Sequence, residues 1–342
     1  MDYSGINAKV KAMKGRLLDY SDYYELASLK SVESVGMKLR ENMAYTEFMD
    51  SVLAQADHSR HIFEQKLLII PVNDYYKIYR FIPDFNIKRY LKTLALKKEM
   101  LLIKLIFCSL YDERNITYSK DELEYISKFD LNFDVTKLIV SKNARELIDN
   151  LKGTEFYDIL DGIYTEGISI FDLEMSLDFY YYNRLWRDKN KYLKGRNKSI
   201  MTDITGTEID MQNIIWIYRL KKYYQIKSND IFKYLIPIHY RLSGDSISKL
   251  VEAPNMNILY DYILNTPYGY AFKDESDLTR CYNNVMYKAY ERYMTQQNSI
   301  AQITDFLHRK QIETENIISL IEGVRYSLSP DEIMKYLHLA SV

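Results

Sequence analysis

Residues 209–215 of this chain read Ile-Asp-Met-Gln-Asn-Ile-Ile, and residues 312–318 read Ile-Glu-Thr-Glu-Asn-Ile-Ile. Each of these two stretches is followed, after nearly the same interval, by a second stretch that is also repeated. Residues 229–235 read Asn-Asp-Ile-Phe-Lys-Tyr-Leu, and residues 331–337 read Asp-Glu-Ile-Met-Lys-Tyr-Leu. We interpret the acid that opens each copy as a helix start. Repetition of one pattern at a fixed interval indicates that the chain is built from copies of one structural unit.

A weaker third copy is found upstream of these two. It opens with Asp-Phe-Asn-Ile at residues 84–87 and closes with Asp-Glu-Leu-Glu-Tyr-Ile at residues 121–126. This copy departs from the others in Lys-Arg-Tyr at residues 88–90 and in the longer interval that follows. The pattern as a whole predicts three units, at residues 1–115, 116–238 and 239–342.

Composition and apolar spacing predict an all-α protein. The 342 residues include only 11 Gly and 6 Pro, whereas a sheet protein needs frequent turn residues. Apolar residues at 317, 320, 321 and 324 recur with the period of an amphipathic helix. Ser-Pro-Asp-Glu at residues 329–332 is a good helix opening, with a Ser cap, a proline in the first turn and acids near the positive end of the helix dipole.

Charge, cysteine content and hydropathy exclude several classes of protein. The formal net charge of −1 gives no overall attraction to nucleic acid or to an anionic membrane. The two cysteines, Cys108 and Cys281, have neither metal-site nor disulfide spacing, so we expect a reducing compartment. No basic region followed by an apolar run begins the chain, so we predict no signal peptide. The apolar runs at residues 67–72 and 100–111 are too short or are interrupted by Lys104, so no membrane span is predicted.

Candidates for catalysis are scarce. The sequence has no Gly-rich phosphate loop, nucleophile elbow or metalloprotease motif. His58 and His61 have the spacing of a metal pair but no third ligand, and we interpret them as ordinary helical histidines. Acid pairs such as 313 with 315 and 331 with 332 are explained by the dipole at a helix start. We therefore predict no catalytic residue, no metal site and no cofactor.

One basic segment, residues 184–198, is a candidate for binding. It reads Arg-Leu-Trp-Arg-Asp-Lys-Asn-Lys-Tyr-Leu-Lys-Gly-Arg-Asn-Lys. It is typical of a solvated helix end that runs into a loop at Gly195. It also fits a docking patch for an acidic protein surface or, with its interleaved Trp and Tyr, a track for a nucleic-acid backbone. Arg187, Lys191 and Arg196 are the candidate partner-binding residues.

An ordered set of short patterns carries a family resemblance. The set consists of Asn-Ala-Lys-Val-Lys-Ala at residues 7–12, Leu-Glu-x-x-Leu-Asp-x-x-Tyr-Tyr-x-x-Leu-Trp at 173–186, Asp-x-x-Asn-Ile at 210–214, Tyr-Leu-Ile-Pro at 234–237 and Glu-Gly-Val-Arg-Tyr at 322–326. In these patterns and their order the chain resembles the family of the d-type subunits of V-type ATPases. The same family is known as the C-type subunits of archaeal and bacterial A/V-type ATPases and ATP synthases. The resemblance runs over essentially the whole length.

The resemblance implies a fold and a role. Three similar helical units would surround a pseudo-threefold axis and form a funnel. One copy per complex would sit peripherally at the cytoplasmic mouth of the membrane rotor ring, which is made of proteolipid subunits, and would receive the central stalk, with its D-type and F-type subunits. It would be a non-catalytic rotor subunit that transmits torque between ATP chemistry and the transport of protons or sodium ions. No nucleic acid would take part.

A second interpretation is a free-standing helical repeat scaffold that binds protein or RNA. Such an array exposes an extended concave face and tolerates further repeats. Three long units whose equivalent pieces lie far apart favour closure around an axis instead. Under the rotor interpretation we hypothesise that the segment around Arg187, Lys191 and Arg196 meets an acidic stalk or ring surface.

Overall fold

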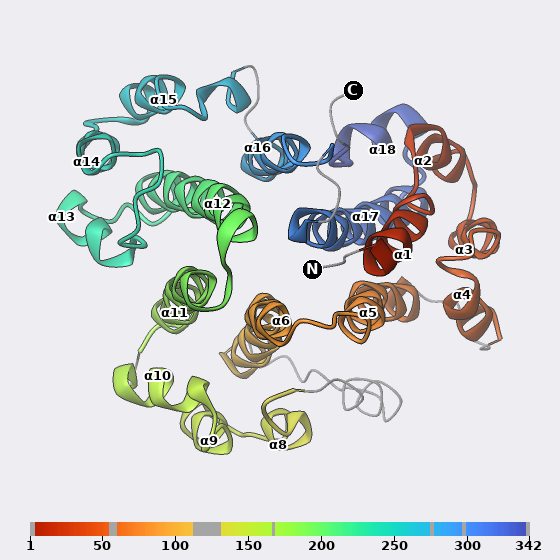
Figure 1. The fold of residues 1–342 in the computed structure, drawn as a ribbon, viewed down its shortest axis with the longest axis horizontal. Helices are drawn as coiled ribbons and strands as arrows, with labels where there is room; N and C mark the ends of the chain where they lie inside the picture. The colour runs from red at the N-terminus through yellow and green to blue at the C-terminus, as the bar shows by residue number, and fades with distance from the viewer. Residues whose placement is uncertain are drawn as a thin grey trace. The chain divides into compact units, whose positions relative to one another are not determined.

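Helices make up every regular element in the described part of the chain, which confirms the predicted all-α class (Figure 1). The computed structural model describes residues 4–54, 60–111, 131–165, 168–273, 277–295 and 299–339. The close predicted for the weakest repeat copy, at residues 121–126, lies outside the described residues.

The chain divides into two compact units, each assembled from separate stretches. Unit 1 comprises Met1–Phe85, Lys194–Thr207 and Pro267–Val342, and unit 2 comprises Asn86–Leu193 and Glu208–Thr266. The three-unit division at residues 1–115, 116–238 and 239–342 stays a prediction.

Unit 1 holds the amino-terminal and carboxy-terminal helices. Its elements are α1 (Ser4–Lys14), α2 (Tyr20–Ala27), α3 (Val32–Arg40), α4 (Thr46–Leu53), α5 (Arg60–Tyr79), the first part of α12 (Gly195–Lys222), η2 (Gly269–Ala271), α16 (Leu278–Glu291), α17 (Ile300–Arg325) and α18 (Pro330–Tyr336). Unit 2 holds the middle of the chain. Its elements are α6 (Phe85–Tyr111), α8 (Val135–Ile139), α9 (Ala144–Asn150), α10 (Glu155–Ile163), α11 (Ile170–Tyr192), the rest of α12, α13 (Ser228–Ile231), η1 (Phe232–Tyr234), α14 (Gly244–Glu252) and α15 (Met256–Leu264).

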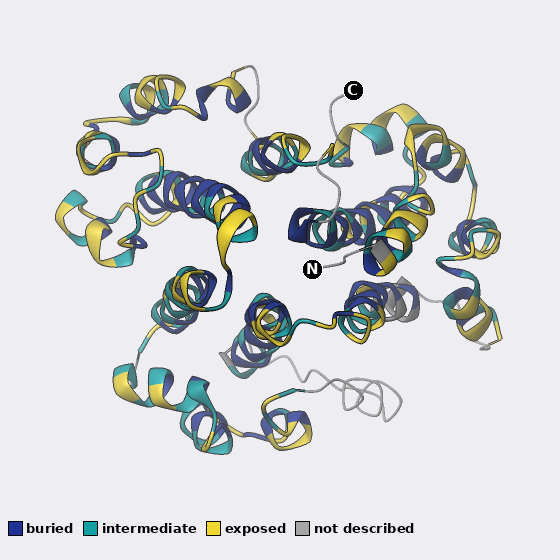
Figure 2. Ribbon diagram, in the orientation of Figure 1, coloured by how far each residue is buried: buried dark blue, intermediate teal, exposed yellow. Residues whose placement is uncertain are grey.

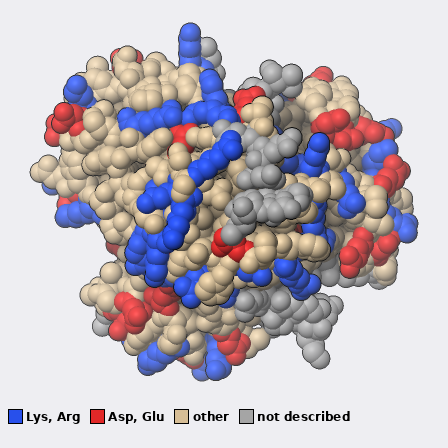
Figure 3. Space-filling view, viewed as in Figure 1, with Lys and Arg blue, Asp and Glu red and all other residues tan. Residues whose placement is uncertain are grey.

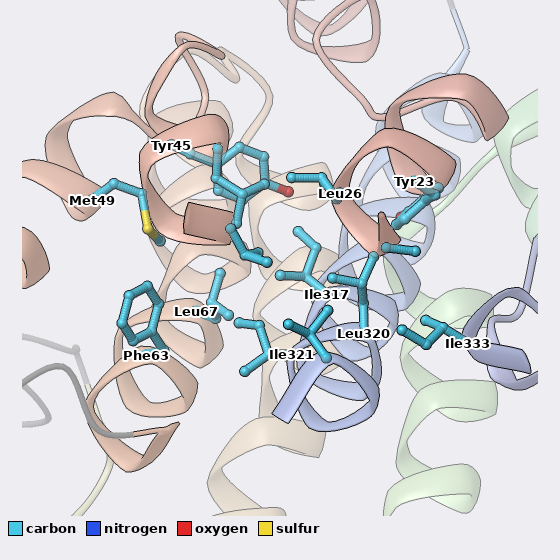
Figure 4. Packing of buried hydrophobic residues seen from close by; sticks show 14 of the residues in the cluster. Tyr23, Leu26, Tyr45, Met49, Phe63, Leu67, Ile317, Leu320, Ile321 and Ile333 are labelled. Carbon is cyan, nitrogen blue, oxygen red and sulfur yellow. The ribbon is translucent and has the colours of Figure 1, made fainter. Parts of the chain in front are cut away.

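The core of unit 1 forms where α2, α3, α5 and α18 pack on α17, with α4 packed against α3 and α5 (Figure 4). The stripe predicted from spacing, Ile317, Leu320, Ile321 and Val324, is buried there, as an apolar helical face requires. Most of α17 is buried, whereas the short helices around it keep an exposed side (Figure 2). Because α17 is buried on most sides, any polar group along it needs a partner inside the protein.

The helix opening predicted at residues 329–332 is confirmed. The Ser329 side chain accepts a hydrogen bond from the backbone of Glu332, and the Glu332 side chain accepts one from the backbone of Ser329, which forms a capping box at the start of α18. Hydrogen bonding to Ser329 lowers the pKa of Glu332.

The repeated asparagine has the same role in both strong copies. The Asn213 side chain in α12 donates to the carbonyl of Ile236 at 3.1 Å and accepts from its N–H at 2.9 Å. Asn316 in α17 donates to the carbonyl of His338 at 3.2 Å and accepts from its N–H at 2.7 Å. Both target residues directly follow the Tyr-Leu that closes each copy, so the sequence repeat encodes a clamp from a long helix to the end of a short one.

The acids that open the two strong copies do not start helices, so that expectation is wrong. Asp210 lies in the middle of α12 and Glu313 in the middle of α17. Asp210 accepts the backbone N–H groups of Tyr240, Arg241 and Leu242 at 3.2, 2.7 and 3.1 Å. Glu313 accepts the backbone N–H of Leu18 at 2.6 Å. Both acids are buried because these donors from distant segments replace water around the carboxylate.

A third carboxylate makes the same kind of link. Glu99 in α6 accepts hydrogen bonds from the Asn132 side chain at 2.9 and 3.1 Å, and one from the Asn132 backbone. Leu18, Asn132 and Leu242 each lie one or two residues before the N-cap of a short helix, respectively α2, α8 and α14. In each of three long helices, therefore, a carboxylate accepts hydrogen bonds from the segment that leads into a set of short helices.

Gly323 is expected to be intolerant of a side chain. A Cβ built on Gly323 would lie 2.6 Å from Cγ1 of Ile333, because α17 and α18 pack closely at this point. Gly323→Ala should therefore destabilise the protein by about 1–3 kcal/mol through overpacking. Gly162→Ala in α10 is the matched control, since a Cβ there meets nothing within 4 Å, and it should stabilise by roughly 0.5–1 kcal/mol. Urea unfolding followed by circular dichroism distinguishes the two, and equal effects would contradict the close packing.

Candidate docking surface

Helices α6 and α11 of unit 2 pack as an antiparallel pair. The guanidinium carbon of Arg89 lies 5.6 Å from the ring centre of Tyr192. The Thr93 hydroxyl donates to the Asp188 carboxylate at 2.9 Å, and Lys104 pairs with Asp178 at 2.6 Å. Residue numbers rise along α6 as they fall along α11. The first turns of α6 therefore lie beside the last turns of α11.

Basic side chains gather at this end of the pair. Lys88, Arg89 and Lys92 come from α6, and Arg187 and Lys191 come from α11. We call these five residues the basic surface. Lys88 is half-buried and the other four are exposed. Lys and Arg side chains also gather on the face of the molecule seen in Figure 3.

The acid that lies between Arg187 and Lys191 on α11, Asp188, is turned inward. Asp188 is only 2% exposed. It accepts from the Thr93 hydroxyl and from Arg184 at 2.6 Å, and it lies 3.5 Å from the Nε atom of Arg187.

Residues 86–98 include no acid, whereas Asp84 lies just before α6. The basic residues of α11 complement the helix dipole at its carboxy-terminal end. The exposed end of the helix pair is thus rich in cations.

The basic segment divides into inward and outward side chains. Arg184 pairs with Glu155 and Asp188, and Lys189 is buried with its Nζ atom 3.3 Å from the ring centre of Trp186. These two cations are structural. Arg187 and Lys191 are exposed, as a binding role requires.

The loop expected at Gly195 is not present. Helix α11 ends at Tyr192 and α12 begins at Gly195, so only two residues separate them. Gly195 has φ of +50°, a conformation that glycine adopts without strain, and it makes this tight turn possible. Arg196 is exposed, but it lies in the part of α12 that belongs to unit 1, so only Arg187 and Lys191 are grouped in the basic surface.

The aromatic residues of the segment are engaged by the protein's own cations. Lys189 covers the ring of Trp186, while Arg89 and Lys191 lie 5.6 and 5.3 Å from the ring centre of Tyr192. Single-stranded nucleic acid would need open aromatic faces on which bases stack. This arrangement favours a protein partner over a nucleic acid.

No metal centre accompanies the basic surface in the part of the chain that the structure describes. Within that part, no cluster of three or more His, Cys, Asp or Glu side chains is placed to hold a metal ion. His58, half of the histidine pair noted in the sequence, lies outside the described residues. Among the helices described, none combines the length and apolar character needed to cross a bilayer.

Three members of the basic surface were missed by sequence reasoning. Lys88, Arg89 and Lys92 lie about a hundred residues from Arg187, so the basic segment alone does not reveal them. The only signal was Lys-Arg at residues 88–89, a departure from the other repeat copies. The antiparallel packing of α6 against α11 brings these two residues beside the basic end of α11.

Comparison with known proteins places the chain in a sequence family. The family model described as ATP synthase (C/AC39) subunit matches residues 6–336. The C-type subunit of the A-type ATP synthase of Methanosphaera stadtmanae is 27% identical over 97% of this chain and 86% of its own length. The corresponding A-type ATP synthase protein of Methanocaldococcus jannaschii is 24% identical over 98% of this chain and 86% of its own length.

Proposed function

Because the chain belongs to the ATP synthase (C/AC39) subunit family, we propose that it is a non-catalytic rotor subunit of a rotary ATPase complex. It joins the central stalk, with its D-type and F-type subunits, to the membrane ring of proteolipid subunits. One copy sits peripherally at the cytoplasmic face and transmits torque between ATP chemistry and ion transport. The match to the family model over residues 6–336 carries this proposal.

The buried links support a torque-transmitting role. A coupling piece must resist deformation, and densely packed helices with satisfied buried polar groups deform little. Glu99, Asp210 and Glu313 each fasten a long helix to the entry of a short-helix set. The same link occurring three times also favours the proposed three-unit organisation around a pseudo-threefold axis, in the form of a funnel.

The basic surface supports the hypothesis of an acidic partner. We propose that Arg187 and Lys191, together with Lys88, Arg89 and Lys92, meet an acidic surface of the stalk or of the ring. Complementary charge speeds encounter and fixes orientation. As the sequence suggested, we propose that Arg196 of unit 1 also meets an acidic partner surface.

A pull-down tests the proposed function. The tagged chain would be used as bait in detergent-solubilised native membranes, with mass spectrometry of the captured proteins. We expect recovery of central-stalk subunits together with the small proteolipid of the ring. Recovery of RNA-associated proteins, or of nothing from membranes, would favour the free-standing scaffold instead. ATP hydrolysis by the isolated chain would contradict the non-catalytic role.

A further inference from the structure

Exposed aromatic side chains gather in unit 2 where α12 ends and α13 and η1 follow. Tyr223, Tyr224 and Phe232 are 63%, 53% and 42% exposed. The ring centre of Phe171 in α11 lies 4.7 Å from that of Tyr224 and 5.2 Å from that of Tyr234 in η1, so the end of α12 and η1 share one aromatic contact. Large apolar side chains that are exposed as a group mark an interaction site.

The same segment is rich in cations. Residues 218–234 contain five Lys and Arg residues and one acid, Asp230, which pairs with Lys233 at 2.6 Å. The Nζ atom of Lys222 lies 5.1 Å from the ring centre of Tyr223, so cation and ring share a face. The aromatic-basic patch, all of it exposed, consists of Lys222, Tyr223, Tyr224, Lys227, Phe232 and Lys233.

The fold does not require these cations. The equivalent segment of the other strong copy, residues 321–337, has two cations and three acids. Its long helix also ends in an exposed tyrosine, Tyr326, and each turn that follows has one residue with positive φ, Gln225 in one copy and Ser327 in the other. The exposed tyrosine therefore belongs to the repeat, whereas the excess of cations is particular to residues 218–234.

Internal hydrogen bonds hold the aromatic-basic patch in place. The carbonyl of Val251, near the end of α14, accepts the Lys221 ammonium at 2.5 Å and the Ser228 hydroxyl at 2.9 Å. These two donors lie on either side of the turn between α12 and α13. A surface that is already ordered loses little conformational entropy when it binds.

Two acids lie on the elements that pack against this segment. Asp172 of α11 accepts the Tyr234 hydroxyl at 3.0 Å, and Glu252 follows Val251 at the end of α14. With these two and Asp230 included, the five cations of residues 218–234 still exceed the acids. The patch is therefore complementary to a negative surface.

The kind of cation distinguishes between possible negative surfaces. Protein interfaces are enriched in arginine and aromatic residues but depleted in lysine, and all three cations of the patch are lysines. Lysine together with Tyr and Phe suits the surface of a bilayer, where rings enter the headgroup layer and long side chains carry ammonium groups to the lipid phosphates. Clusters of about four to eight Lys and Arg residues beside a membrane indicate anionic lipids.

We propose that the aromatic-basic patch binds the surface of an anionic phospholipid bilayer. Phe232 and Tyr223 enter the headgroup layer, and the lysines meet lipid phosphates. The proposed function reaches the membrane only through the proteolipid ring, so a direct lipid contact goes beyond it.

The aromatic-basic patch and the basic surface lie at opposite ends of α11. Phe171, beside the patch, is at the start of this helix, whereas Arg187 and Lys191 are in its last turns. At 1.5 Å per residue the two ends are roughly 24–30 Å apart. A bilayer at the patch would therefore leave the basic surface open to a protein partner.

Vesicle binding by the full chain tests the electrostatic part of the proposal. Co-sedimentation would use vesicles of phosphatidylglycerol and phosphatidylcholine in equal parts, and vesicles of phosphatidylcholine alone. We expect binding to the anionic vesicles only. Lys222→Gln with Lys227→Gln should lower the partition coefficient about 25-fold, since each cation near an anionic surface contributes about fivefold. Lys137→Gln with Lys142→Gln, which removes two exposed lysines elsewhere in unit 2, is the matched control and should bind like the unmodified chain.

Fluorescence tests whether the aromatic residues enter the bilayer. A tryptophan introduced as Phe232→Trp should be quenched by brominated lipids in anionic vesicles, beyond the quenching seen in the unmodified chain with its two tryptophans. Tyr326→Trp, at the equivalent helix end of the other copy, is the control and should show no added quenching.

Several results would overturn the lipid contact. They are absence of binding to anionic vesicles, equal losses in the two double lysine variants, and binding without added quenching of Phe232→Trp. Tighter binding of single-stranded RNA than of vesicles would assign the patch to nucleic acid. Loss of stalk or ring subunits from the pull-down with Tyr223→Ser and Phe232→Ser, without any vesicle binding, would assign it to a protein. The vesicle assays contain no other subunit, so their outcome is independent of the proposed function.

Discussion

Replacement of Glu313 by leucine is expected to destabilise the protein by about 3–5 kcal/mol, the cost of breaking a buried ion pair. Lys310 is 1% exposed, and its ammonium lies 2.6 Å from the Glu313 carboxylate. The same carboxylate accepts the hydroxyl of Tyr45 and the backbone N–H of Leu18. Burial, together with the nearby charge of Glu313, raises the pKa of Tyr45 well above its usual range, so its hydroxyl stays a donor. Removal of the acid leaves a buried cation and two donors without their acceptor.

Urea unfolding followed by circular dichroism would measure this loss. Glu315→Leu is the matched control, because Glu315 lies two residues away on the exposed side of α17 and its replacement should change stability by less than about 0.5 kcal/mol. The double variant Lys310→Met with Glu313→Leu should recover much of the loss, since neither buried charge remains. A Glu313→Leu effect no larger than that of Glu315→Leu would show that the link is not structural.

Reversal of two charges on the basic surface should have the second large effect. Arg187→Glu with Lys191→Glu changes this part of the surface from positive to negative, opposite the acidic partner that we propose. Like charges brought together across an interface cost several kcal/mol, so affinity should fall by about a hundredfold at low salt. The difference should shrink at 1 M salt, where the screening length is about 3 Å. Affinity would be measured by titrating the chain onto membranes that hold the rotor complex stripped of this subunit.

Lys137→Glu with Lys142→Glu is the matched control for the charge reversal. Both lysines are exposed in unit 2, and the net charge changes by the same amount. This control should bind nearly as well as the unmodified chain if position, rather than total charge, decides. Equal losses for the two double variants, or a loss for Arg187→Glu with Lys191→Glu that salt does not alter, would contradict docking through the basic surface.

Sequence reasoning was most successful where the information is local. The helical class, the buried stripe from Ile317 to Val324 and the capping box at Ser329 each depend on residues within a few turns of one another. The repeat of Asn213 and Asn316 was also visible, and the structure shows that both residues clamp the close of their own copy. Helical period and capping are short-range properties, so a single chain displays them.

The reasoning failed where an acid has a distant partner. Asp210 and Glu313 were expected at helix starts, because an exposed acid is most stable near the positive end of the dipole. Each lies in the interior of a long helix, where backbone N–H groups from another segment satisfy it. Glu99 gave no signal at all, since its partner Asn132 is 33 residues away.

Only part of the basic surface could be predicted from the sequence. Arg187 and Lys191 were chosen from a basic run, and the structure separates them from the buried Arg184 and Lys189 of the same run. A run of basic residues does not show which of its side chains face solvent, so only the packing of α11 decides which cations are exposed. The contribution of α6 to the basic surface follows from that same packing.

The sequence by itself determined that this protein is helical, internally repeated and a member of an ATP synthase subunit family, because periodicity, caps and ordered motifs are written in neighbouring residues. Only the tertiary structure decided which charges are buried, which are paired and which face outward. The reason is physical. The free energy of a charged group depends on the water it loses and the donors it gains. Those donors come from distant segments: the backbone N–H that Glu313 accepts belongs to Leu18, 295 residues away.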